Sequence, residues 1–152
     1  MKKTIRALSV VALILAGLCL LLLITCICMQ KTLLPIFGAP DAVLEYFYVP
    51  VASIVSVVGI LLAAFFLLLG INMDIVIMEI LSPALVFVTP ILSSLVSFWQ
   101  TVFAGRYHGS AFMAGLASVS RICNFPMYAG SLASILVVLA CGMSIVWKKM
   151  SK

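Results

Sequence analysis

Three of the five cysteines lie close enough to the ends of apolar segments to take part in thiol chemistry. Cys26 and Cys28 come near the end of the first apolar segment, and Cys123 comes just before the last one. A disulfide between Cys123 and either of the others requires the first and last segments to be neighbours, on a side of the membrane that is oxidising. Because residues two apart on a helix point to different sides, Cys26 and Cys28 are poorly placed to act as a pair. Thiol–disulfide exchange is therefore one hypothesis for this chain.

A polar face on the third apolar segment is the second candidate for chemistry. Ser93, Ser97 and Gln100 recur at steps of three and four residues, which places them on one side of a helix. Such a face can line a path for ions or small polar molecules, with Glu79 as the gate at its inner end. Serine hydroxyls also bond to carbonyls of their own helix, and small residues pack helices together in lipid. The face therefore predicts either a channel lining or a packing surface.

The position of Glu79 depends on where the third helix begins. Ser82 followed by Pro83 is typical of a helix start, with Ser as the N-cap and Pro in the first turn. This pair predicts a third span over residues 83–104 and leaves Glu79 as a solvated carboxylate at the membrane surface. If the helix instead begins at Ile75, Glu79 lies about one turn inside the bilayer as a proton or cation site.

The remaining charged side chains indicate contacts at the membrane surface rather than catalysis. Arg121 falls on the same predicted side as Asp41 and Glu45, so we expect it to pair with one of them or with lipid phosphate. His108 is the single histidine, whereas a metal site needs three or four converging ligands. Phosphate-binding loops, nucleophile elbows and metalloprotease helices are missing from the sequence as well. We therefore expect no metal and no cofactor.

Four long apolar segments must position these side chains, and they define the fold class. They contain no Asp, Glu, Lys or Arg and cover residues 7–29, 49–69, 83–104 and 126–147. A hydrocarbon core of about 30 Å needs about 20 apolar residues of helix. Charged residues make up only 9% of the chain, against about 25% in soluble domains. Continuous apolar runs also lack the alternation of a β-barrel. The sequence predicts an all-α, polytopic membrane protein, a single domain with a four-transmembrane-helix bundle.

Residues 105–124 are too polar for a further span. A turn at residues 105–109 and a cap at Ser110 predict a short helix that runs to Cys123. Its modest apolar face suits a helix that lies on the membrane surface. Pro126 then opens the fourth span. We therefore expect a short outer interfacial helix between spans three and four.

The basic residues lie at the ends of the apolar segments and set the predicted orientation. The net charge is +5, with six Lys or Arg near the two termini and three in the other loops. The positive-inside rule then places both termini in the cytoplasm. Basic clusters beside spans contact lipid headgroups, so nucleic acid is not an expected partner. The first segment is too long for a signal peptide and no cleavage site follows it, so we expect an uncleaved span in the plasma (inner) membrane.

Three functions remain open at this point. We expect first a non-enzymatic accessory, regulatory or assembly subunit, which binds a membrane-protein partner or a second copy through helix–helix contacts. The alternatives are a small oligomeric channel or transporter and a membrane thiol–disulfide oxidoreductase. Four spans with thiols near one face resemble the membrane enzymes that pass disulfide electrons to a quinone. Those enzymes carry Cys-x-x-Cys and a second pair in the other outer loop, whereas this chain has Cys-x-Cys and a single loop cysteine.

Overall fold

The computed structural model describes residues 1–36 and 46–152, and this part of the chain is helical with no strand. Its helices are α1 (Lys2–Cys28), α2 (Gln30–Ile36), α3 (Val51–Met73), α4 (Val76–Tyr107) and α5 (Gly109–Met150). Four of them, α1, α3, α4 and α5, are long and apolar enough to cross a membrane. The predicted all-α class with four long apolar helices is therefore confirmed.

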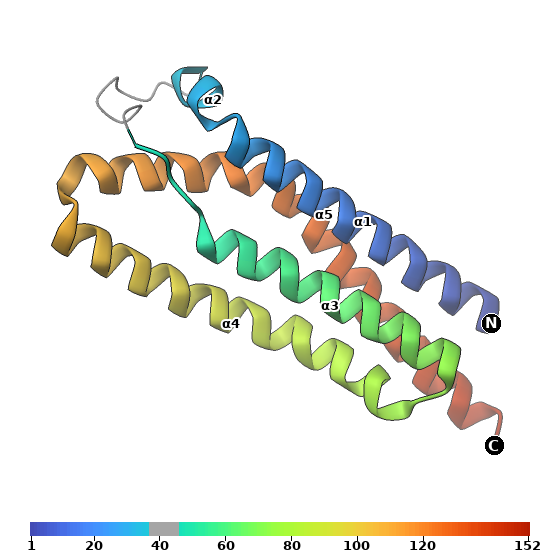
Figure 1. The fold of residues 1–152 in the computed structure, drawn as a ribbon. Coiled ribbons are helices and arrows are strands. Elements are labelled where there is room, and N and C mark those ends of the chain that lie inside the picture. Colours follow the sequence, from blue (N-terminus) through green and yellow to red (C-terminus); the bar gives the residue numbers. More distant parts are fainter. Residues whose placement is uncertain (37–45) are drawn as a thin grey trace.

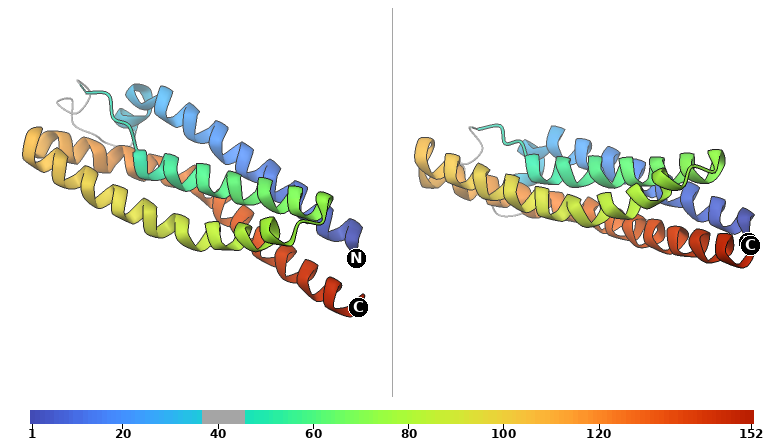
Figure 2. Two further views of the ribbon diagram at one scale, coloured as in Figure 1. Left: turned by 60° about the horizontal axis from the view of Figure 1, so that its bottom comes forward. Right: turned by 90° about the horizontal axis from the view of Figure 1, so that it is seen from below.

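The long helices form one elongated bundle (Figure 1). α3 packs against α1, α4 and α5, and α5 also packs against α1 and α4. Both chain termini and the turn between α3 and α4 lie at one end, which we call the terminal end (Figure 2). α2 and the turn between α4 and α5 lie at the other, which we call the hairpin end. α4 and α5 form an antiparallel hairpin that reaches beyond the start of α3.

The turn between α3 and α4 is made by Asp74 and Ile75. Asp74 adopts the left-handed conformation, with φ 55° and ψ 33°, which Asp tolerates better than most residues. Ile75 is extended, and its N–H donates to the carbonyl of Gly70 at 3.0 Å. The chain therefore reverses within two residues, and α4 begins directly at Val76.

The predicted helix start at Pro83 is wrong, because α4 begins at Val76, about two helical turns earlier. Ser82 is not an N-cap. Its Oγ instead donates to the carbonyl of Ala63 in α3 at 2.7 Å, and the side chain is fully buried. The Ser82 hydroxyl, which we predicted to cap the start of a helix, joins α4 to α3 instead.

Pro83 is accommodated inside α4 by a neighbouring helix. Proline has no N–H, so the carbonyl of Glu79 four residues earlier loses its helical donor. Sγ of Cys141 in α5 donates to that carbonyl at 3.2 Å. Membrane bundles tolerate proline where a neighbour bonds to the freed carbonyl in this way.

The predicted short outer helix ending at Cys123 is not a separate element, and no helix begins at Pro126. α4 continues to Tyr107, the chain turns at His108, and α5 runs without interruption through Pro126. Gly109 begins α5 with φ 81°, a conformation that favours glycine. The first part of α5 belongs to the core of the hairpin end, because Leu116 and Cys123 are buried in the same apolar cluster as residues of α1 and α2. This packing extends α5 beyond the fourth apolar segment.

Small residues allow the long helices to approach closely, as expected for association in lipid. The fully buried alanines are Ala12 and Ala16 in α1, Ala63 and Ala64 in α3, and Ala133 and Ala140 in α5. α3 and α4 also come very close at Gly59. A Cβ added to Gly59 would overlap the side chain of Thr89, which is tied to its own helix by a 2.6 Å hydrogen bond to the carbonyl of Leu85.

We predict that Gly59→Ala lowers the free energy of unfolding by about 1–3 kcal/mol, the usual cost of overpacking. The added methyl forces α3 away from Thr89. Denaturation of the purified protein in mixed detergent micelles measures the change. Gly17→Ala and Gly142→Ala are matched controls, because a Cβ at either position meets nothing within 4 Å. A Gly59→Ala protein as stable as these controls would contradict the close α3–α4 contact.

Candidate functional site

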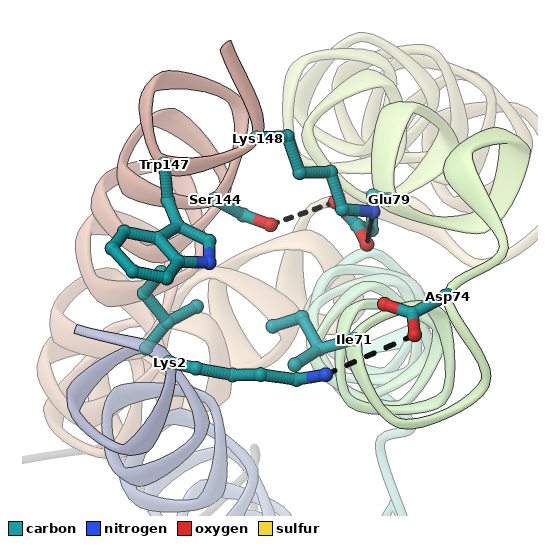
Figure 3. Close-up of a pocket in the computed structure, with 8 residues that line it drawn as sticks. Lys2, Ile71, Asp74, Glu79, Ser144, Trp147 and Lys148 are labelled. Carbon is teal, nitrogen blue, oxygen red and sulfur yellow. Dashed lines mark hydrogen bonds and ion pairs between the residues drawn. The ribbon is translucent and has the colours of Figure 1, made fainter. Parts of the chain in front are cut away.

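A cluster of polar and charged side chains lies at the terminal end, between α4 and α5 (Figure 3). It consists of Glu79 from α4 and Ser144 and Lys148 from α5, and we call it the terminal cluster. These three residues line a cavity of about 90 Å³, together with Lys2, Ile5, Ile71, Asp74 and Trp147. The cavity is thus bordered by α1, α3, α4 and α5.

Glu79 is buried, with 2% of its surface exposed, and both its carboxylate oxygens are paired. Oε2 accepts a hydrogen bond from Oγ of Ser144 at 2.8 Å, and Oε1 lies 2.6 Å from Nζ of Lys148. Ser144 and Lys148 are four residues apart, so one face of α5 carries both partners. The Lys148 side chain is one-third exposed, and it links the buried carboxylate to the surface. Glu79 is therefore a buried charge inside the bundle rather than a solvated carboxylate at its surface.

α3 makes room for Glu79 at Gly70. A Cβ on Gly70 would come within 2.7 Å of Cγ of Glu79 and 2.9 Å of its backbone nitrogen. The stem of Glu79 therefore lies directly against the backbone of α3. A second, exposed ion pair joins Lys2 to Asp74 at 3.8 Å, and pairs of this kind contribute little to stability.

We predict that Lys148→Met lowers the free energy of unfolding by about 3 kcal/mol. The value is at the low end for a broken buried pair because Lys148 is partly exposed. Glu79→Gln in the same chain should recover at least half of this loss, because no buried charge then remains. A double-mutant cycle followed by denaturation in mixed micelles measures the coupling. Lys149→Met is the matched control, and an equal effect of the two lysine substitutions would show that the pair is not formed.

The polar face of α4 bonds to α3 and to the segment directly before it. Ser93 donates from Oγ to the carbonyl of Ala52 at 2.9 Å and accepts a 2.8 Å hydrogen bond from Ser56. Gln100 donates from Nε2 to the carbonyl of Val49 at 2.7 Å. Two of the three residues predicted for a polar path thus hold α4 to α3. Glu79, the predicted gate, lies at the terminal end and is not brought together with them.

A polar hollow between α3, α4 and α5 lies near the hairpin end, and we call it the hairpin-end cleft. It comprises two adjoining cavities of about 310 and 540 Å³, both lined by Ser53, Ser97 and Ser120. Ser56 lines the larger cavity about 8 Å from the start of α3, at 1.5 Å per residue. Polar groups of the cleft therefore lie along the apolar helices themselves, and not only at their ends.

Two side chains of the hairpin-end cleft are exposed and unpaired. Ser97 on α4 and Asn124 on α5 are both exposed, and neither side chain makes a hydrogen bond within the described part of the chain. Of the other cleft hydroxyls, those of Ser56 and Ser93 join α3 to α4. Ser120 bonds to its own helix, at the carbonyl of Leu116 and 2.9 Å. Ser97 and Asn124 therefore present free donors and acceptors at the outer surface of two apolar helices.

Sequence reasoning missed Gln30, the first residue of α2. Its side chain is 1% exposed and forms a pair of 2.9 Å hydrogen bonds with the backbone of Tyr48, donating to the carbonyl and accepting from the N–H. Its Nε2 also donates to the carbonyl of Ile27. Gln30 thus ties the segment before α3 to the end of α1. A lone amide directly after an apolar segment was the available signal.

The three candidate thiols differ in burial, and the packing of α1 on α5 brings Cys26 to the apolar cluster that contains Cys123. Cys123 is fully buried, and Cys26 packs against the apolar cluster that contains it. Cys28 is exposed on α1, and all five cysteines are free. No group of three His, Cys, Asp or Glu side chains within the described residues could hold a metal ion.

We predict that, among single-cysteine variants, a maleimide modifies Cys28 first and Cys123 much more slowly. Exposure of the thiol controls the rate, because the reagent must reach the sulfur. Mass spectrometry of the folded protein in detergent measures the rates, and modification after denaturation provides the full extent. Equal rates for Cys28 and Cys123 in the folded protein would contradict the packing of α1 against α5.

The predicted ion pairing of Arg121 with Asp41 or Glu45 stays a prediction, because Asp41 and Glu45 lie outside the described residues. Arg121 itself is exposed on α5.

No family model, curated protein or solved structure matches this chain. Two regions of the molecule have different chemistry. The terminal cluster is satisfied within the bundle, and the hairpin-end cleft presents unpaired groups outward.

Proposed function

We propose that this protein is an integral membrane protein that acts as an accessory, regulatory or assembly subunit, and that the hairpin-end cleft is its contact surface. The exposed, unpaired side chains of Ser97 and Asn124 carry this proposal. Polar side chains on membrane helices bond across helix–helix contacts, since lipid tails offer them no partner. The occupant of the cleft is a transmembrane helix of a partner protein or of a second copy, with a polar side chain opposite Asn124.

The terminal end faces the cytoplasm in this proposal, with the helices in the plasma (inner) membrane. Lys2, Lys3 and Arg6 gather there with the basic residues at the end of α5, because both termini lie at the same end of the bundle. Basic residues beside spans favour the cytoplasmic side. The partner helix then meets the cleft in the outer half of the membrane.

A channel or transporter is the second candidate, because Ser97 lines both cavities of the polar cleft. It has less support than assembly, since Glu79 is paired with Lys148 and Ser93 is bonded to α3. Flux through proteoliposomes tests it, and unchanged flux after Ser97→Ala and Glu79→Gln would remove it. Thiol–disulfide exchange has the least support, because Cys123 is fully buried.

We predict that Asn124→Ala reduces recovery of the partner about three- to tenfold, which corresponds to the loss of one interhelical hydrogen bond. Co-purification from native membranes, and between two differently tagged copies in defined liposomes, measures the loss for either kind of partner. Ser118→Ala is the matched control on the same helix, because Ser118 bonds to the carbonyl of Ala114 and lies outside the cleft. The proposal is wrong if both substitutions reduce recovery equally or neither reduces it.

A further inference from the structure

A second open hollow lies at the terminal end, between the start of α4 and the end of α5, and we call it the terminal cleft. Its volume is about 640 Å³. Val76 and Ile80 from α4 and Ile145 from α5 form apolar walls, and each is about half exposed. Lys149 and Lys152 line its outer part. The terminal cleft therefore combines an apolar wall with a basic rim.

Basic side chains outnumber acidic side chains at the rim. Two acidic side chains reach the terminal cleft, and both are already paired, Asp74 with Lys2 and Glu79 with Lys148. Lys149 and Lys152 are exposed and have no ion-pair partner within the described residues. The first N–H groups of α4 add partial positive charge at the same place. The charge of the cleft is thus complementary to an anion.

We propose that the terminal cleft binds an anionic phospholipid of the surrounding bilayer. The phosphate contacts Lys149 and Lys152, and the acyl chains lie along Val76, Ile80 and Ile145. A soluble anion would satisfy the lysines but leave these apolar walls unused, whereas a phospholipid fits both. The assignment to the cytoplasmic leaflet, where anionic lipids are enriched, depends on the proposed orientation. Lipid binding itself depends on neither the orientation nor the hairpin-end cleft.

Trp147 provides a reporter, because it lines the terminal cleft. The chain has two tryptophans, so Trp99→Phe leaves Trp147 as the single source of tryptophan fluorescence. This variant is reconstituted into phosphatidylcholine vesicles that contain a minor fraction of brominated phosphatidylglycerol or, separately, brominated phosphatidylcholine. At equal bromine content, the anionic lipid should quench Trp147 more strongly, because it concentrates in the cleft.

Lys149→Gln with Lys152→Gln should lower this lipid preference about tenfold, which corresponds to about 1.4 kcal/mol. Lys3→Gln with Arg6→Gln is the matched control, because it removes the same charge from the same end of the bundle outside the cleft. The control should keep the preference within about twofold of the parent protein.

Equal quenching by the two brominated lipids would overturn the proposal, and so would an equal loss of preference in the control. Asn124→Ala should leave the preference unchanged, because Asn124 lies at the hairpin end. Loss of the partner in that variant and loss of lipid preference in the lysine variant are therefore separate results.

Discussion

The buried carboxylate of Glu79 constrains the terminal end of the bundle from three helices. A charge away from water is tolerated only when it is paired, and here α5 supplies both Lys148 and Ser144. α3 must present Gly70 at the same height, because any Cβ there would meet Glu79. Glu79 lies inside only because α4 begins at Val76. One carboxylate thus links the start of α4, the end of α3 and the last turns of α5.

The same requirement explains the seam between α3 and α4. Polar groups in lipid must be satisfied inside the protein, and Ser82, Ser93 and Gln100 each bond to a backbone carbonyl at or before α3. Ser93 and Gln100, whose spacing suggested a path for ions, hold two helices together instead. The hairpin-end cleft departs from this pattern, because Ser97 and Asn124 stay unpaired and exposed. That departure is why we propose a contact with a partner there.

The four long helices could be predicted from the sequence, because a charge-free run of about 20 residues is a strong local signal. The true helix starts at Val76 and Gly109 could not, because the starts predicted at Pro83 and Pro126 relied on rules for proline that describe helices in water. In the bundle, the carbonyl freed by Pro83 is bonded by Cys141, 62 residues away. Lys148, the ion-pair partner of Glu79, is 69 residues away. Spacing could place Ser93 and Gln100 on one face, but it carried no information about which helix that face would meet.

In our proposal the hairpin-end cleft contacts a protein, while the other outer surfaces contact lipid. Photocrosslinking in native membranes distinguishes these contacts, with a photoreactive residue in place of Ser97 and, separately, in place of Ile14. Ile14 is a matched position because it is 62% exposed on the apolar surface of α1. We expect a discrete protein adduct at position 97, from a partner or a second copy, and only lipid adducts at position 14. Lipid adducts alone at both positions would contradict it.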